Sequence, residues 1–330
     1  MPDRKWHSCP MVGTEPRLPS TTAAQGPELI SARRVSKAYG SVEVLADVTF
    51  DIQPGITGLL GSNGAGKTTM LGMILGLHPI DGGTLAVYGH NPWSAGTDIR
   101  GVMGYAPEHH TLPADLRAND FVRHVAELHG LPRSEATTRA SDALWLVGLG
   151  EERFRPMGTM STGQRQRVKL AQAIAHDPSM ILLDEPTDGL DPVQRDSMLD
   201  LIRGIADDFK INVIVSSHLL HEVERICDGV VIIDRGRTLA SGTIDAVRGN
   251  DEIAVIVEID SSAVQAVAVV DSLMRAGWTA SSSGRRITIG GDDDSVFDAA
   301  RDHCVAVGVG INRLQRRRLS LEDVFLEKLG

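Results

Sequence analysis

The chain has 330 residues, of which 42% are hydrophobic, and this length is sufficient for two globular domains. Its 43 acidic and 33 basic residues give a formal net charge of −10, which argues against the broad basic face of a nucleic-acid-binding protein. No apolar run reaches the length of a membrane span, and the N-terminus lacks a signal-peptide pattern, so we expect a cytoplasmic protein that contacts membrane only through a partner.

Residues 1–27 are rich in Pro, Ser and Thr and show no hydrophobic period, so we expect a disordered N-terminal tail. A folded region is expected to begin at Glu28, with strands over residues 29–35 and 44–52. Between them, Tyr39 lies in a turn that continues through Gly40 and Ser41. Its ring is either a partly exposed packing residue or a stacking platform for a base, and the pattern alone favours neither.

A glycine-rich run with the sequence GSNGAGKTT is the strongest single motif, and it lies between an apolar strand pattern over residues 56–60 and a helical pattern over 70–75. Its glycines allow successive backbone N–H groups to face an anion, and the following helix start adds partial positive charge. Lys67 would reach the terminal phosphates of a nucleotide, and the Thr68 hydroxyl would ligate Mg²⁺. The candidate binding residues are Gly61, Ser62, Asn63, Gly64, Ala65, Gly66, Lys67, Thr68 and Thr69.

Two further strand patterns follow, over residues 82–89 and 102–108. Glu108 ends the second, in a position from which a side chain can reach a ligand at the sheet edge, although by itself it could equally be a solvated loop carboxylate. Residues 118–148 show helical patterns with breaks at glycine and proline, and we interpret 118–160 as a helical insertion on an α/β body.

The run Met160-Ser161-Thr162-Gly163-Gln164 precedes a helical pattern over residues 165–175. Ser161 followed three residues later by Gln164 is the capping-box arrangement, which by itself only starts a helix. A helix start rich in small residues is also an anion site. Two phosphate-binding helix starts with a single lysine loop would suggest a ligand shared between two copies of the chain.

Two adjacent acids, Asp184 and Glu185, end an apolar strand pattern over residues 180–183. Carboxylates beside a core destabilise a fold unless they are paired, so a purely structural strand would gain nothing from them. Beside a phosphate loop, Asp184 would hold Mg²⁺ through its hydration shell and Glu185 would polarise the attacking water. His218 ends the next apolar strand pattern, over 211–217, and is either structural or part of the same edge.

Together the runs GSNGAGKTT, MSTGQRQR, MILLDEPTDGLDP and SSH resemble, in order and spacing, an ABC transporter ATP-binding subunit over residues 28–245. The resemblance implies an α/β P-loop NTPase fold with a helical subdomain, and a protein that binds ATP and Mg²⁺. In that family two subunits close head to tail, so that each ATP lies between the phosphate loop of one copy and the signature of the other. A homodimer is therefore implied.

The resemblance also implies a role for each matching residue. Tyr39 becomes the aromatic residue that stacks on adenine, and Glu108 takes the Q-loop position as a possible Mg²⁺ ligand. The catalytic residues are Lys67, Glu185 and His218, and the metal ligands are Thr68, Glu108 and Asp184. The remaining assignments are Ser161, Gly163 and Gln164 in the signature, Asp191 in the D-loop, and His218 as the switch histidine.

Two positions depart from the family pattern. The signature usually reads LSGGQ, whereas this chain has Met160 in place of Leu and Thr162 in place of the first Gly. A side chain at 162 could crowd the approach to the γ-phosphate, and we predict slower closure with activity retained. Glu108 replaces the usual Gln, as in the GYLPE form of several exporter-type members, and a carboxylate can still bind Mg²⁺.

Residues 251–330 form a separate pattern, with strands over 253–259, 286–289 and 309–314. Helices are expected over 262–276 and 295–305, and the alternation predicts a small accessory α+β domain of ferredoxin-like type. The closing run from Ser320 to Leu329 contains LEDVFL and resembles the tail of ATPases of ABC-2 type exporters.

The resemblance thus implies an ATPase that drives export through a separate ABC-2 type permease, as a peripheral protein on the inner face of the cell membrane. The alternative is a soluble ABC ATPase that acts on ribosomes or DNA, but such proteins carry tandem ATPase units, coiled coils or zinc cysteines, which this sequence lacks. A regulatory module that binds ATP without turnover would lack the catalytic acid, whereas Glu185 is present. The sequence does not indicate the cargo.

Overall fold

The structure is a computed structural model that describes residues 28–108, 112–248, 253–291 and 293–318. Its contacts divide the chain between Gly242 and Thr243 into two compact units, here called the first and the second unit. The predicted N-terminal tail and the LEDVFL run lie outside the described residues. The predicted assignment of the two units as an ATPase domain and an accessory domain remains a prediction.

A six-stranded sheet with the strand order β5-β6-β7-β3-β8-β9 forms the centre of the first unit. The registers of β5 with β6, β6 with β7, β7 with β3 and β3 with β8 are parallel, so the carboxyl ends of these strands share one edge of the sheet. The nearly continuous apolar runs of β3 and β6 fit a parallel sheet that is covered on both faces. The strands are β3 (Ile56–Leu60), β5 (Met103–Ala106), β6 (Met180–Asp184), β7 (Asn212–Ser217), β8 (Gly229–Asp234) and β9 (Arg237–Thr243).

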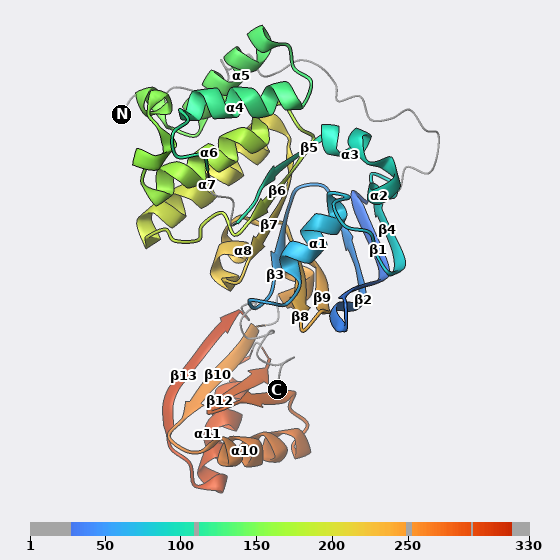
Figure 1. Ribbon diagram of the computed structural model, residues 1–330. Helices are drawn as coiled ribbons and strands as arrows, with labels where there is room; N and C mark the ends of the chain where they lie inside the picture. The colour runs from blue at the N-terminus through green and yellow to red at the C-terminus, as the bar shows by residue number, and fades with distance from the viewer. Residues whose placement is uncertain (1–27, 109–111, 249–252, 292, 319–330) are drawn as a thin grey trace. The chain divides into compact units, whose positions relative to one another are not determined.

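A second, antiparallel sheet has the order β2-β1-β4, with β1 (Ile30–Tyr39), β2 (Val42–Ile52) and β4 (Gly82–Val87). The structure extends β1 through Tyr39, which therefore ends a strand, whereas the sequence pattern had placed it in the turn. The turn itself is only Gly40 and Ser41, and Gly40 adopts a positive φ of 62°. Helix α1 (Lys67–Ile74) shares one hydrophobic core with both sheets and lies between them (Figure 1).

Some helices of the first unit pack on the central sheet, and others form the predicted helical insertion. Helix α6 packs on β5 and β6, and α8 packs on β3 and β7. The helical pattern predicted for residues 118–148 is confirmed by α4 and α5, which pack on each other and on α6 (Figure 1). The helices are α2 (Pro92–Ala95), α3 (Thr97–Gly101), α4 (Ala118–Leu128), α5 (Arg133–Leu146), η2 (Gly150–Phe154), η3 (Met157–Thr159), α6 (Thr162–Ile174), α7 (Pro192–Phe209) and α8 (Leu220–Ile226).

The second unit has one antiparallel sheet of order β11-β12-β10-β13 and two longer helices, α10 and α11, that share its apolar core. This order confirms the predicted ferredoxin-like arrangement. Strand β11 was missed because its sequence, ASSS, has one apolar residue, Ala280, and no apolar alternation to signal a strand. The elements are α9 (Ile244–Arg248), β10 (Ile253–Ile259), α10 (Ala263–Arg275), β11 (Ala280–Ser283), β12 (Arg286–Gly290), α11 (Ser295–Val307) and β13 (Ile311–Arg318).

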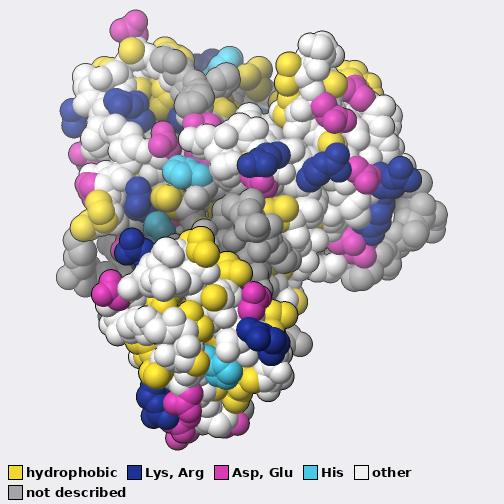
Figure 2. Space-filling view, turned by 90° about the horizontal axis from the view of Figure 1, so that it is seen from below, with side chains coloured by type: hydrophobic (Ala, Val, Ile, Leu, Met, Phe, Trp, Pro, Cys, Tyr) yellow, Lys and Arg dark blue, Asp and Glu magenta, His cyan; other side chains and the backbone are white. Residues whose placement is uncertain are grey.

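The surface carries charged side chains of both signs, as the 43 acidic and 33 basic residues of the chain lead us to expect. On the face drawn in Figure 2, Lys and Arg side chains are interspersed with Asp and Glu side chains, and the described residues there form no broad basic surface. Within the described ranges, no helix combines the length and the apolar character that crossing a membrane requires.

Candidate nucleotide-binding site

The glycine-rich loop joins the carboxyl end of β3 to the start of α1. Its glycines are required by the path of the chain: Gly64 and Gly66 have φ values of 82° and 105°, and a Cβ on Gly66 would lie 2.5 Å from the Leu45 side chain. A Cβ on Gly61 would lie 2.3 Å from the carbonyl oxygen of Ile233. No side chain caps α1, so the first N–H groups of the helix face the loop without a side-chain acceptor and can bind an anion.

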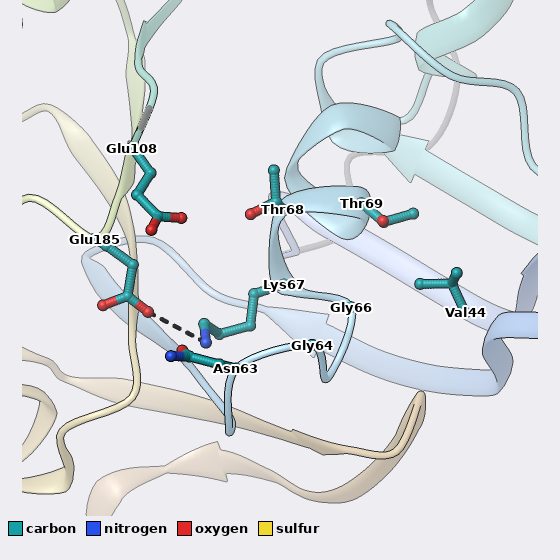
Figure 3. Close-up of a pocket in the computed structure, with 9 residues that line it drawn as sticks. All are labelled: Val44, Asn63, Gly64, Gly66, Lys67, Thr68, Thr69, Glu108 and Glu185. Atoms are coloured by element: carbon teal, nitrogen blue, oxygen red, sulfur yellow. Dashed lines mark ion pairs between the residues drawn. The ribbon is translucent and has the colours of Figure 1, made fainter. Parts of the chain in front are cut away.

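A pocket of about 510 Å³ lies at this loop, within the size range of small-molecule sites. In Figure 3, Lys67, Thr68, Glu108 and Glu185 face the same space, while Val44 lies beyond the loop at Gly66. The pocket therefore brings together predicted residues that are far apart in the sequence. Its lining residues are Val44, Asn63, Gly64, Gly66, Lys67, Thr68, Thr69, Glu108 and Glu185.

Lys67 lies in the floor of this pocket with only 7% of its side chain exposed. Its Nζ donates to the carbonyl oxygens of Gly61 at 2.8 Å and Ser62 at 3.3 Å. The same Nζ lies 3.2 Å from Glu185 Oε1, although the two atoms lack the alignment of a hydrogen bond. A buried ammonium group held in this way places a positive charge between the loop and the acid.

Thr68 and Asp184 meet at the carboxyl edge of the sheet, where the Thr68 hydroxyl donates to Asp184 Oδ2 at 2.9 Å. The Thr68 hydroxyl and the Glu108 carboxylate in the same pocket, with the Asp184 carboxylate beside Thr68, thus provide hard oxygen donors of the kind that Mg²⁺ and its bound water prefer. The residues present therefore fit the predicted ion.

Glu185 and His218 directly follow the carboxyl ends of β6 and β7, and they form a hydrogen-bonded pair at this same edge of the sheet. His218 Nδ1 lies 2.9 Å from Glu185 Oε2, whereas the buried Oε1 has no hydrogen-bond partner. Glu185 also adopts a left-handed backbone with φ of 47°, which is a strained conformation for a residue with a side chain. The Ser216 hydroxyl supports it, since it accepts from the N–H of Glu185 at 3.0 Å and donates to Asp184 at 2.6 Å.

The predicted signature residues lie elsewhere, at the start of α6. Ser161 accepts from the Gln164 N–H at 3.2 Å, and its own N–H donates to the Gln164 side chain at 3.0 Å, which confirms the capping box. Gly163 lies close to α7, because a Cβ there would be 2.9 Å from the Gln194 side chain. Neither Ser161, Gly163 nor Gln164 lines the pocket at the loop.

Tyr39 and Asp191 also lie outside the pocket lining. Tyr39 is 46% exposed, with Lys37 Nζ 5.4 Å from its ring centroid and the His78 ring edge-on at 6.0 Å. Asp191 caps α7 and accepts from the Gln194 N–H at 2.9 Å. Asp191 thus has a local structural role that is sufficient to explain it.

The sequence prediction missed two parts of this site. Val44 lines the pocket, but a valine in a strand pattern carries no signal of ligand contact. Ser216 was part of the predicted strand, and a serine at the end of an apolar run carries no sequence signal of a site residue. The structure shows it fully buried, where a hydroxyl must find a partner.

Comparison with known proteins gives the same family as the motifs. The family model described as ABC transporter matches residues 45–188, which include the loop, Glu108, the signature run and Asp184-Glu185. The chain is 34% identical over 216 residues to the linearmycin resistance ATP-binding protein LnrL of Bacillus subtilis, covering 65% of this chain and 69% of that protein. It is 29% identical over 309 residues to an uncharacterized ABC transporter ATP-binding protein, YxlF, of the same organism, covering 91% and 99%.

One solved structure and a further sequence relative agree with this family. The structure of an ATP-binding subunit of an ABC transporter aligns with a TM-score of 0.59 and 30% identity, over 67% of this chain and 92% of that chain. The bacitracin transport ATP-binding protein BcrA of Bacillus licheniformis is 34% identical over 212 residues, 64% of this chain and 68% of that protein. The motifs, the P-loop fold and these relatives agree, and the chain belongs to the ABC transporter ATP-binding proteins.

Proposed function

We propose that this protein hydrolyses ATP and thereby drives export through a separate ABC-2 type permease. The observation that carries the proposal is Glu185, whose Oε2 is held by His218 at 2.9 Å while its buried Oε1 is left without a hydrogen-bond partner in the phosphate pocket. Oε1 faces the Lys67 ammonium at 3.2 Å but accepts no hydrogen bond, which suits the acceptance of a proton from an attacking water.

The other pocket residues complete a phosphoryl-transfer site. Lys67, whose ammonium lies 3.2 Å from Glu185 Oε1, would bind the terminal phosphates. His218, 2.9 Å from Glu185 Oε2, would orient that acid and contact the γ-phosphate. Thr68, Glu108 and Asp184 would hold Mg²⁺. When bound, this ion offsets negative charge on the phosphate oxygens. The catalytic set is then Lys67, Glu185 and His218.

Nucleotide binding would use the loop and the exposed ring of Tyr39. The N–H groups of residues 61–69 surround the phosphates, and Tyr39, which is half exposed at the end of β1, stacks on the base. Ser161, Gly163 and Gln164 do not line the pocket of their own chain, which supports their action on the ATP of a second copy. The working form is accordingly a homodimer that closes on two ATP molecules.

A membrane partner is supported by the names of similar proteins. Relatives of this chain act in linearmycin resistance, bacitracin transport and Nod factor export, the last a protein of Burkholderia orbicola that is 32% identical over 231 residues. We therefore place this protein in the cytoplasm, at the inner face of the cell membrane, where its only membrane contact is made through the permease.

The substitution Glu185→Gln tests the proposal, because it keeps the size of the side chain and removes the base. ATP should still bind with an affinity close to that of the wild type, while kcat falls by at least about 100-fold. The ATP-bound variant should also double its molecular mass in light scattering. An exposed acid of the second unit provides the control: Asp298→Asn should leave the rate unchanged. A rate near that of the wild type in Glu185→Gln would overturn the assignment.

The partner is tested with the same variant in cells. Glu185→Gln protein purified with ATP should retain a membrane protein with several spans. Co-sedimentation with ribosomes, or retention on DNA, without a membrane protein would instead identify the soluble alternative. The acidic net charge and the interspersed charges in Figure 2 favour the first outcome.

A further inference from the structure

Glu222 is a buried acid in α8 that does not line the nucleotide pocket. Only 2% of the residue is exposed, and α8 begins two residues after His218. A carboxylate taken out of water is unfavourable unless its oxygens are matched by donors, so its partners show what the fold gains from it.

Both oxygens of Glu222 accept hydrogen bonds from hydroxyl groups. The Thr187 hydroxyl donates to Oε1 at 2.7 Å, and the Ser217 hydroxyl donates to Oε2 at 2.6 Å. Arg195 Nε lies 3.2 Å from Oε1 without hydrogen-bond alignment and supplies a nearby positive charge. Thr187 and Ser217 are themselves buried, at 3% and 1% exposure.

The two hydroxyl donors stand in informative places along the chain. Thr187 comes two residues after Glu185, and Ser217 comes directly before His218. The Glu222 carboxylate therefore holds the chain at two points: two residues after Glu185 and one residue before His218. Ser217 also accepts from the Leu219 N–H at 3.0 Å, so the turn that carries His218 is held from both sides.

The strained backbone of Glu185 explains why such anchors are needed. A left-handed conformation in a residue with a side chain persists only where its surroundings over-determine it. Ser216 holds Glu185 from its N–H side, and Thr187 is the next anchored residue after it. The turn beyond Glu185 is closed by the Asp188 N–H, which donates to the Glu185 carbonyl oxygen at 3.1 Å. Loss of the Glu222 contact would remove the side-chain anchor at Thr187 and let this turn shift the carboxylate relative to His218.

We propose that Glu222 is a positioning residue for ATP hydrolysis, which holds Glu185 and His218 in register through the hydroxyls of Thr187 and Ser217. The inference rests on the proposed function, since it concerns the rate of that reaction. Because Glu222 does not line the nucleotide pocket, loss of its carboxylate should lower kcat and leave ATP affinity intact.

Two kinds of variant test this. Glu222→Gln leaves one acceptor oxygen for two hydroxyl donors, and kcat should fall by at least about tenfold, as a small misplacement of a reacting group costs. Thr187→Val removes one donor while keeping the shape of the side chain and should lower kcat in the same way. Thr187→Ser keeps the hydroxyl and should restore most of the rate. The double variant Glu222→Gln, Thr187→Val should fall by less than the product of the single effects.

Isothermal titration of ATP in the presence of EDTA gives the second readout, and all of these variants should bind within about twofold of the wild type. The control is Asp200→Asn on α7, an exposed acid paired with Arg225, which should change neither quantity. Because valine is isosteric with threonine, the Thr187 series stays informative even if Glu222→Gln does not fold.

Each outcome bears on the inference. If Glu185→Gln loses hydrolysis but Thr187→Val keeps the wild-type kcat, Glu222 is only a structural anchor and the inference is wrong while the proposed function stands. Equal loss of rate in Thr187→Val and Thr187→Ser would also contradict it, because the hydroxyl would then not be the cause. If the wild-type protein hydrolyses no ATP, the proposed function fails first and the inference fails with it.

Discussion

The two units of this chain differ in what their interiors contain. Within the described residues, the buried polar and charged side chains all belong to the first unit, and most gather at the carboxyl edge of its central sheet. The buried core of the second unit is formed by apolar side chains and Cys304. Burial of charge opposes folding, so the first unit keeps its charges for a purpose other than stability.

This difference separates two kinds of consequence. A change in the second unit should act on stability alone, because its interior holds no group that the proposed reaction uses. A change at the sheet edge of the first unit should act on nucleotide binding or turnover. A second-unit variant that changes nucleotide binding or turnover, or a sheet-edge variant that changes stability alone, would contradict this comparison.

Truncation of a buried leucine in the second unit should give the largest effect. Leu273 on α10 is fully buried in its apolar core, and Leu273→Ala should cost about 2–5 kcal/mol of unfolding free energy through lost burial and the cavity left behind. Calorimetry should show a lower transition temperature for this unit. The ATPase rate, measured below that transition, should equal the wild-type rate, and a parallel loss of ATP affinity would show that the units are not independent.

Removal of the pocket cation should act on binding. Lys67→Met keeps much of the length and apolar surface of the side chain, but removes the ammonium that lies 3.2 Å from Glu185 Oε1. ATP affinity should weaken by about 100-fold, equivalent to about 2.7 kcal/mol. Arg286→Met, which breaks an ion pair with Glu258 in the second unit, is the matched control and should bind ATP normally. Equal affinities in the two variants would contradict the placement of the phosphates at Lys67.

Acid should destabilise the first unit through a stacked histidine pair, of which His176 is the more buried member. The rings of His129 and His176 stack with centroids 3.7 Å apart, and burial, with the neighbouring His129, lowers the pKa of His176 to about 3. Between this value and the usual histidine pKa of about 6.5, the unfolded chain binds the proton and the folded chain does not. Stability should therefore be full above about pH 6.5 and should fall by up to about 1.4 kcal/mol per pH unit below it.

Chemical denaturation at several pH values measures this slope. His176→Gln should reduce this slope between about pH 6 and pH 4, since the larger of the two lowered histidine pKa shifts is removed while that of His129 remains. His303, which bonds Ser272 in the second unit, provides the control, and His303→Gln should leave the slope of the first unit unchanged. A wild-type slope in His176→Gln would show that other groups cause the acid sensitivity.

The sequence predicted those parts of the site whose chemistry is carried by local backbone and spacing. The loop from Gly61 to Thr69 fixes its own path, and the strand that ends in Asp184 and Glu185 is long and apolar enough to identify. The prediction missed Ser216 and the contacts of Glu222, because a serine or a glutamate looks the same in sequence whether it is exposed or buried. Only the parallel register of β6 and β7 brings Ser216 to Asp184.

The fold was predictable to a similar depth. Apolar periodicity predicted the longer helices and the buried strands β3, β6 and β7, but the buried strand β8 was missed. Strand β11 and the extension of β1 through Tyr39 depend on pairing with a neighbouring strand. Pairing of this kind is set by tertiary contacts, which override weak local propensity.

The smallest expected effect concerns the signature. The Thr162 hydroxyl accepts from Arg165 at 3.2 Å, and its methyl group is so close to the turn before α7 that a Cβ on Gly189 would lie 3.3 Å from it. The side chain is held by its own chain, yet nothing in the core requires it, because Thr162 is exposed. Thr162→Gly should therefore leave the fold intact and raise the ATPase rate about two- to fivefold, less than about 1 kcal/mol.

Thr162→Ser separates the two possible causes, since it keeps the hydroxyl and removes the methyl. If crowding by the methyl slows closure, the serine variant should be nearly as fast as the glycine variant. If the Arg165 contact is the cause, only glycine should be fast. An unchanged or lower rate in Thr162→Gly would refute the crowding hypothesis. The buried charged residues at the sheet edge would then set the turnover rate by themselves, and the exposed side chain of Thr162 in the signature would not affect it.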